Sequence, residues 1–246
     1  MDRRFQVEVL PDIDWAELRR RVLHAEELGF DLATTADQYV DWKNSTVPWF
    51  DLWATLSALT EATNTIRLAP CVAQIPMRDP ATLARQVLTV DHVSGGRVEA
   101  ALGLGLTVDP GYNMIGAPNW DNPERAARFG EYVQIVDQLL STARCSFAGD
   151  YSVDAAAVHE SVQSPRPAIT IAAMGPRMMR YAAPHADALN TMSFGAGADE
   201  LLADATSLKV KMAKASEQVD RNPDSLRHSF LLFDGDARAQ GGRLFY

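Results

Sequence analysis

Residues 66–105 read IRLAPCVAQIPMRDPATLARQVLTVDHVSGGRVEAALGLG and contain two apolar runs separated by one helical pattern. The first run, Ile66–Ala73, mixes β-branched and small residues, which is typical of a strand buried on both faces. From Pro80 onward, apolar residues recur at the spacing of an amphipathic helix, and two glycines end that helix before the second run, Val98–Leu102. Two strands joined by one helix lie parallel, because no tight turn reverses the chain between them. The stretch therefore predicts a strand–helix–strand unit.

The same unit recurs along the rest of the chain. Five further strands are expected at Phe5–Leu10, Phe30–Ala36, Ala168–Met174, Ala188–Met192 and Arg227–Asp234. The resulting seven strands predict an α/β fold, a (β/α) barrel, as a single domain over residues 1–246. A closed barrel of this type has eight strands, and an open one leaves two unpaired edges, so the last βα unit is expected to be missing.

Two segments interrupt this pattern. Residues 107–118 and 141–167 show no periodicity, and both are expected to be irregular insertions that determine substrate specificity. Asn122 is expected to cap the long helix between them, which Pro123 would open.

Composition narrows the class of protein. The 246 residues carry a net charge of -9 and the sequence pI is near 5.0, so neither nucleic acid nor an anionic membrane surface is expected as a partner. No apolar run approaches the ~20 residues of a membrane span, and no leader is recognised, which favours a cytoplasmic protein. Cys71 in a strand and Cys145 in an expected loop form neither a disulfide framework nor a metal-ligand spacing.

Four stretches, in their order and spacing, resemble one known family. They are AEELGFDLATTADQ at 25–38, the SGGR and LGLG motifs within 94–105, NPERAARFGEYVQIVDQLL at 122–140 and AAMGPRMMRYAA at 172–183. Together they resemble the bacterial luciferase-like family of flavin- and deazaflavin-dependent oxidoreductases. The resemblance covers nearly the whole chain and implies a (β/α)8 TIM barrel. In that family one more strand and helix normally follow the seventh strand, which agrees with the expectation of a missing βα unit.

The resemblance also implies where a cofactor binds. In the family, a non-proline cis peptide at the third strand lies against the flavin ring, and the matching bond here joins Cys71 to Val72. The family's phosphate site corresponds to Gly175 and the backbone N–H groups of Arg177 and Met178, which open a helix. Unpaired backbone donors, the helix dipole and a positive side chain all favour an anion at such a position.

The glycines of the LGLG motif are a second candidate contact with the cofactor. Gly103 and Gly105 look like nucleotide-binding glycines, but Val108 stands where a G-x-G-x-x-G turn needs its third glycine. They are therefore interpreted as a close backbone approach at a strand end, and Gly103 is counted with the cofactor-binding residues.

The residues assigned to catalysis follow the second strand. Asp37 and Gln38 stand where the family commonly has an acidic residue followed by His, but Gln cannot titrate and so cannot serve as a general acid or base. Glu8 is expected to point into the barrel from the first strand, where it either serves the site or pairs with a core Arg. Trp42 matches a tryptophan that deazaflavin-using relatives place over the active site, and it is assigned to the substrate.

The acidic residue and the histidine that would complete a catalytic site of this family are both absent from their usual positions. Those deazaflavin relatives also carry a Glu just after the fourth-strand glycines, where this chain has Leu106, Thr107 and Val108, with Asp109 displaced. None of the five histidines replaces the missing one, since His159, His185 and His228 are expected in loops or element ends away from the mouth of the barrel.

The function implied by the resemblance is oxidation or reduction of a small organic substrate. The cofactor would be FMN, reduced by a separate flavin reductase and used with O2 in monooxygenation, or the deazaflavin coenzyme F-420 in hydride transfer. A homodimer formed through the second and third helices is expected from the family. The alternative is a flavin-binding or scaffold barrel without catalysis, favoured by Gln38 and by the missing unit.

Overall fold

The computed structural model describes residues 4–192 and 198–231, and its strands form a series of parallel neighbours. The order is β1 (Gln6–Glu8), β2 (Leu32–Thr35), β3 (Arg67–Pro70) continued by β4 (Ala73–Gln74), β5 (Ala100–Gly103), β8 (Ile169–Ala172), β9 (Ala188–Met192) and β10 (Arg227–Leu231). A parallel bridge between Leu68 and Val98 joins the sheet of β1 to β3 to the sheet of β4 to β10. This is the parallel order that the sequence predicts.

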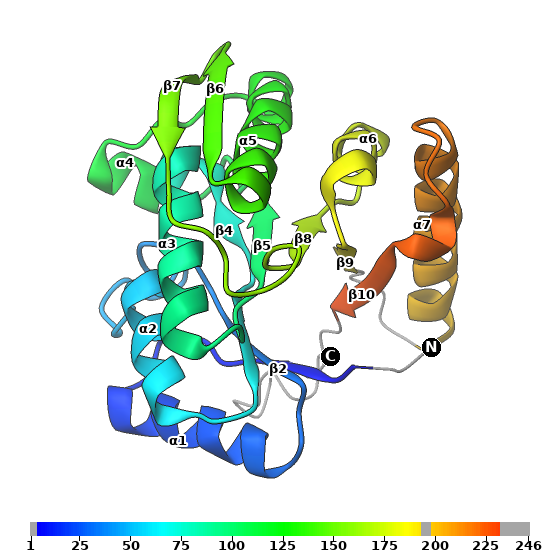
Figure 1. Cartoon of the computed structure of the whole chain (residues 1–246). Helices are drawn as coiled ribbons and strands as arrows, with labels where there is room; N and C mark the ends of the chain where they lie inside the picture. Colours follow the sequence, from blue (N-terminus) through cyan, green and yellow to red (C-terminus); the bar gives the residue numbers. More distant parts are fainter. Residues whose placement is uncertain (1–3, 193–197, 232–246) are drawn as a thin grey trace.

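Helices connect successive strands and pack on the outside of the series (Figure 1). They are α1 (Trp15–Glu27), α2 (Leu52–Ala62), α3 (Pro80–Ser94), α5 (Asn122–Thr142), α6 (Pro176–His185) and α7 (Ala198–Glu217). Their apolar stripes are buried against the strands: Leu83 and Val87 of α3 and Phe129 and Val136 of α5 are almost completely inaccessible to solvent. No helix in the described ranges is long and apolar enough to cross a membrane.

Aspartates begin four of these helices. Asp14, Asp51, Asp79 and Asp121 cap α1, α2, α3 and α5, and each carboxylate accepts a backbone N–H of the first turn. The prediction that Asn122 caps α5 is wrong by one residue. Asp121 accepts the N–H of Glu124 at 2.9 Å, and its negative charge favours the positive end of the helix dipole.

The SGGR motif, at the end of α3, connects three elements through hydrogen bonds of Arg97. Gly95 ends the helix in the left-handed conformation. Arg97 then donates to the carbonyl oxygens of Thr60 at 2.9 Å, Ile66 at 3.0 Å and Ser94 at 2.9 Å. The end of α2, the start of β3 and the end of α3 are therefore held by one guanidinium.

The two segments expected to be irregular contain regular structure. Residues 107–118 include the short helix α4 (Gly111–Ile115), and residues 141–167 include an antiparallel hairpin of β6 (Arg144–Ala148) and β7 (Ser152–Ala157). In Figure 1 the hairpin stands beside α5. Cys145 therefore lies on a strand, not in a loop, and is buried. The strands were missed because this two-stranded sheet packs on α5 and has no continuous apolar run.

After the hairpin, residues 161–163 of the second segment are held by Asp91 of α3, which is fully buried. One oxygen of its carboxylate accepts the Ser161 hydroxyl at 2.7 Å and the Val162 N–H at 2.8 Å. Ser161 and Val162, which belong to no helix or strand, are thus fixed by the buried Asp91 side chain.

The two ends of the strand series are β1 and β10. Within residues 4–192 and 198–231 these two strands are not paired with each other. Residues 232–234 of the last expected strand lie outside the described residues. Trp53 of α2 is buried in the core of its own chain.

Candidate functional site

A cavity of about 620 Å³ lies inside the series of parallel strands. The strand register puts Thr34 beside Ala69, Ala101 beside Thr170 and Asn190 beside Ser229, and all six line the cavity. Because side chains alternate between the two faces of a strand, these residues share the inner face. Most of them are small, so they do not fill the interior as bulky residues do in a packed barrel core.

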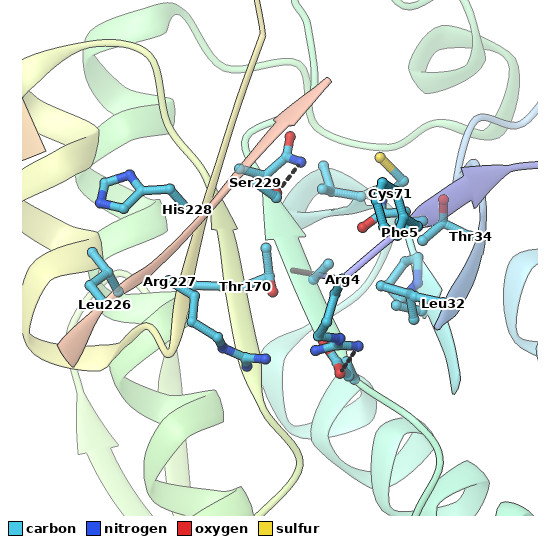
Figure 2. Close-up of a pocket in the computed structure, with 18 of the residues that line it drawn as sticks. Arg4, Phe5, Leu32, Thr34, Cys71, Thr170, Leu226, Arg227, His228 and Ser229 are labelled. Atoms are coloured by element: carbon cyan, nitrogen blue, oxygen red, sulfur yellow. Dashed lines mark hydrogen bonds and ion pairs between the residues drawn. The ribbon is translucent and has the colours of Figure 1, made fainter. Parts of the chain in front are cut away.

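Polar side chains interrupt the mostly apolar wall. Asn190 donates to the Ser229 hydroxyl at 2.7 Å, and the Thr34 hydroxyl donates to the Val7 carbonyl at 3.3 Å. At another part of the wall Arg4 pairs with Glu99 at 2.7 Å (Figure 2). These groups could orient a ligand whose bulk contacts the apolar residues.

His228 of β10 is also among the lining residues, although the sequence placed it away from the mouth. Figure 2 shows its ring on the opposite side of β10 from Arg227 and Ser229. Burial lowers the pKa of His228, and the nearby Lys209 ammonium lowers it further.

Cys71 and Val72 form part of the cavity wall where β3 passes into β4. The peptide bond between them is cis, as the family resemblance implies. Gly103 lies directly against Val72, since a β-carbon at Gly103 would overlap Val72 Cγ2. The expectation of a close backbone approach at this glycine is confirmed, and the group that approaches it is the protein's own side chain.

Asp37 does not line the cavity. Its carboxylate is buried and forms a two-point ion pair with Arg78, at 2.6 and 2.7 Å, and one of its oxygens also accepts the Gln74 N–H at 2.8 Å. Burial opposes the charge of Arg78, but the hydrogen bonds and the charge of Asp37 outweigh it and raise the pKa of Arg78. Both oxygens of the residue assigned to catalysis are therefore occupied within the protein.

A second set of contacts reaches Gln74 from the segment of α4. The Tyr112 hydroxyl donates to Gln74 Oε1, and a β-carbon at Gly105 would overlap both groups. The guanidinium of Arg125 lies 5.2 Å from the centre of the Tyr112 ring and donates to the Leu104 carbonyl at 3.0 Å. Burial raises the pKa of Tyr112 to about 12, with Asp109 adding to the rise.

Sequence reasoning missed these partners of Asp37 and Gly105. Arg78 stands just before the cap of α3, where it reads as an exposed polar residue, and Gln74 reads as part of a strand. An aromatic residue at 112, inside a polar segment, was the available signal of a buried anchor.

The other predicted residues are dispersed. Gln38 is half-buried, and its side-chain oxygen is buried without a hydrogen-bond partner among the described residues. Glu8 is buried on β1, and Trp42 is 40% exposed in the loop after β2. Neither Glu8, Gln38 nor Trp42 lines the cavity in the described ranges.

The predicted phosphate site lies at the start of α6. Gly175 is the N-cap residue, no side chain caps the helix, and the space beside the Gly175 Cα is open. Met178 is buried, whereas Arg177 is exposed and its guanidinium makes one long hydrogen bond, 3.4 Å, to the Pro123 carbonyl. An uncapped helix N-terminus with a nearby Arg can accept an anion.

Parallel strands joined by crossover helices around an interior cavity are the architecture of a (β/α) barrel. The chain belongs to the luciferase-like monooxygenase family, whose model matches residues 3–233.

Two relatives and one solved structure illustrate the similarity. An F420-dependent glucose-6-phosphate dehydrogenase of Amycolatopsis mediterranei is 29% identical over 227 residues, which cover 89% of this chain and 66% of that protein. Pyrimidine monooxygenase RutA of Klebsiella pneumoniae is 28% identical over 229 residues, covering 88% of this chain and 59% of that protein. The structure of an F420-dependent secondary alcohol dehydrogenase in complex with an F420-acetone adduct superimposes with a TM-score of 0.77 at 22% identity, covering 93% of this chain and 68% of that chain.

This chain matches its relatives over part of their length. The solved structure supports the luciferase-like TIM-barrel fold alone, and this chain spans less than two thirds of the length of the two relatives. The relatives are named as oxidoreductases of two kinds, a dehydrogenase and a monooxygenase.

Proposed function

We propose that the chain is the cofactor-binding part of an oxidoreductase that uses a flavin or a deazaflavin and acts on a small organic substrate. The observation that carries the proposal is the mostly apolar cavity with Cys71 and Val72 in its wall. Its volume, about 620 Å³, falls within the range of ~300–1,000 Å³ that small-molecule sites occupy. When bound, such a cofactor supplies the electron pair for reduction of a substrate or of O2.

The residues present fit this kind of group in two places. Cys71 and Val72, with Ala69 and Ala101 beside them, would contact the flat ring. The uncapped start of α6 would hold the phosphate through the N–H groups of Arg177 and Met178, with Gly175 leaving room for it. Cys71 and Val72 follow β3 and the start of α6 follows β8, so both places follow the carboxyl ends of parallel strands, whereas most other residues that line the cavity lie near the amino ends.

Neither Asp37 nor Gln38 is proposed to transfer a proton in the reaction. Asp37 is engaged by Arg78 and Gln74, and Gln38 cannot titrate. Gln38 can donate or accept a hydrogen bond to a substrate held near the end of β2, and Trp42 would cover that substrate. The substrate itself is selected by the segments 107–118 and 141–167, and the enzyme is proposed to act as a homodimer.

Because the Asp37 carboxylate is already paired with Arg78, a second candidate function is also favoured. It is a barrel that binds the cofactor without catalysing a reaction. The two candidates differ in turnover. The test is a fluorescence titration with FMN and with F420, followed by substrate-dependent oxidation of whichever reduced cofactor binds. Binding with turnover supports the enzyme, binding without turnover supports the carrier, and binding of neither cofactor contradicts both.

A further inference from the structure

Gln74 links the cavity wall to two buried anchors. It follows Val72 by two residues, and β4 places it beside Gly103 of β5. Its backbone N–H donates to Asp37 at 2.8 Å, and its side-chain oxygen accepts the Tyr112 hydroxyl. With 5% of its surface exposed, Gln74 has little access to water that could replace either bond.

The first anchor is the ion pair of Asp37 and Arg78. Asp37 is 3% exposed and the Arg78 side chain 10% exposed, so the pair is shielded from solvent. The backbone carbonyl of Arg78 in turn accepts the Tyr132 hydroxyl at 3.1 Å. These contacts fix the end of β2 to the start of α3 and to α5. The Gln74 N–H therefore donates to a carboxylate whose orientation is set by Arg78.

The second anchor is Tyr112, which is completely buried although it lies in a segment that was expected to be irregular. Arg125, 1% exposed, lies over its ring and holds the chain on both sides of α4, through the Leu104 carbonyl and the Asn119 side chain. The hydroxyl of Tyr112 therefore reaches Gln74 from a fixed position.

We infer that Asp37, Arg78 and Tyr112 are positioning residues, which hold Gln74 and through it keep Val72 and Cys71 in place against the cofactor ring. The inference rests on the proposed function, because it concerns the wall that the cofactor would contact. It assigns to Asp37 a role different from acid–base catalysis, since its carboxylate already accepts two hydrogen bonds from Arg78 and one from the Gln74 N–H. Misplacement of a positioning group by about 1 Å can cost about a hundredfold in rate, so the position of this wall matters to the site.

Asp37→Asn and Tyr112→Phe test the inference, and Glu26→Gln is the matched control. One oxygen of Glu26 accepts the backbone N–H groups of Asn64 at 2.8 Å and Ile66 at 2.9 Å, just before β3. Like Asp37, Glu26 is a carboxylate that fixes the backbone of the third strand, but at the opposite end of that strand from Cys71. All three variants should lower the melting temperature.

Two measurements separate positioning from general stability. The first is the Kd of the cofactor that the wild type binds, measured below the melting temperature of each variant. The second is hydrogen–deuterium exchange of the peptide that contains Gln74, without cofactor. Asp37→Asn should raise the Kd about tenfold and speed exchange at Gln74, Tyr112→Phe should raise the Kd by a smaller factor, and Glu26→Gln should change the Kd by less than about twofold.

Equal Kd values for the wild type, Tyr112→Phe and Glu26→Gln would overturn the inference even if Asp37→Asn failed to fold. A wild type that bound neither FMN nor F420 would overturn the proposed function and this inference together. The wild-type titration therefore distinguishes the two failures.

Discussion

Replacement of Gly105 by Ala tests how the end of β5 is packed. Gly105 has a φ of +70°, and a β-carbon there would overlap the Tyr112 hydroxyl and the Gln74 oxygen. The left-handed backbone costs about 1–2 kcal/mol for a residue with a side chain. The overlap adds about 1–3 kcal/mol, because Tyr112 is buried and bonded and cannot move freely. Gly105→Ala should therefore lower the free energy of unfolding by about 2–5 kcal/mol.

Substitutions at two other glycines measure the backbone cost and the packing cost separately. Gly29 has a φ of +82° with nothing within 4 Å of an added β-carbon, so Gly29→Ala should show only the backbone cost of about 1–2 kcal/mol. Gly103 has no positive φ, but its β-carbon would overlap Val72, so Gly103→Ala should show only the packing cost of about 1–3 kcal/mol.

Urea unfolding of the three variants measures these differences. The cost of Gly105→Ala should be close to the sum of the other two, and it should be smaller when Tyr112→Phe is the background, because the overlapping hydroxyl is gone. If Gly105→Ala cost no more than Gly29→Ala, the close packing of Tyr112 and Gln74 on Gly105 would be refuted.

Two further predictions concern half-buried charges. Arg97→Met removes hydrogen bonds to four backbone carbonyls and should lower the unfolding free energy by about 3 kcal/mol, measured by urea unfolding against Arg20→Met on the surface of α1. Burial works against ionised Asp137, but hydrogen bonds and charge from His185 and Arg166 outweigh it and hold the pKa of Asp137 below its usual value. Its contribution is therefore full above about pH 4 and is lost as the pH falls through the lowered pKa, so Asp137→Asn should flatten the loss of stability below about pH 4. An equally steep loss in both proteins would contradict this.

The parallel order of the strands could be predicted from the sequence because it depends on local patterns. Apolar runs of strand length alternate with helical periodicity and leave few topologies. The bounds agree within a few residues, and Ala188–Met192 agrees at both ends. The hairpin of β6 and β7 could not be predicted in this way, because its stability comes from packing on α5 and its strands alternate only weakly.

The candidate site was harder to predict, since it depends on pairs of residues distant in the sequence. Asp37 lies at the end of a strand, where parallel barrels carry their chemistry, but its pairing with Arg78, 41 residues later, depends on how α3 begins beside β2. The same holds for Gly105 and Tyr112. Gly103 was interpreted correctly as a close approach, because a glycine at a strand end indicates that something must fit there, although not which group.

Alkylation of the two cysteines tests the central claim most directly. Cys71 lines the cavity and is partly accessible, whereas Cys145 is buried on β6 outside it. The rate of carbamidomethylation at each would be measured by mass spectrometry with and without a saturating concentration of FMN or F420. Slower alkylation of Cys71 alone, in the presence of the cofactor that binds, is the expected result. Unchanged alkylation of Cys71 while a cofactor is bound would contradict the assignment of this cavity as the ring site.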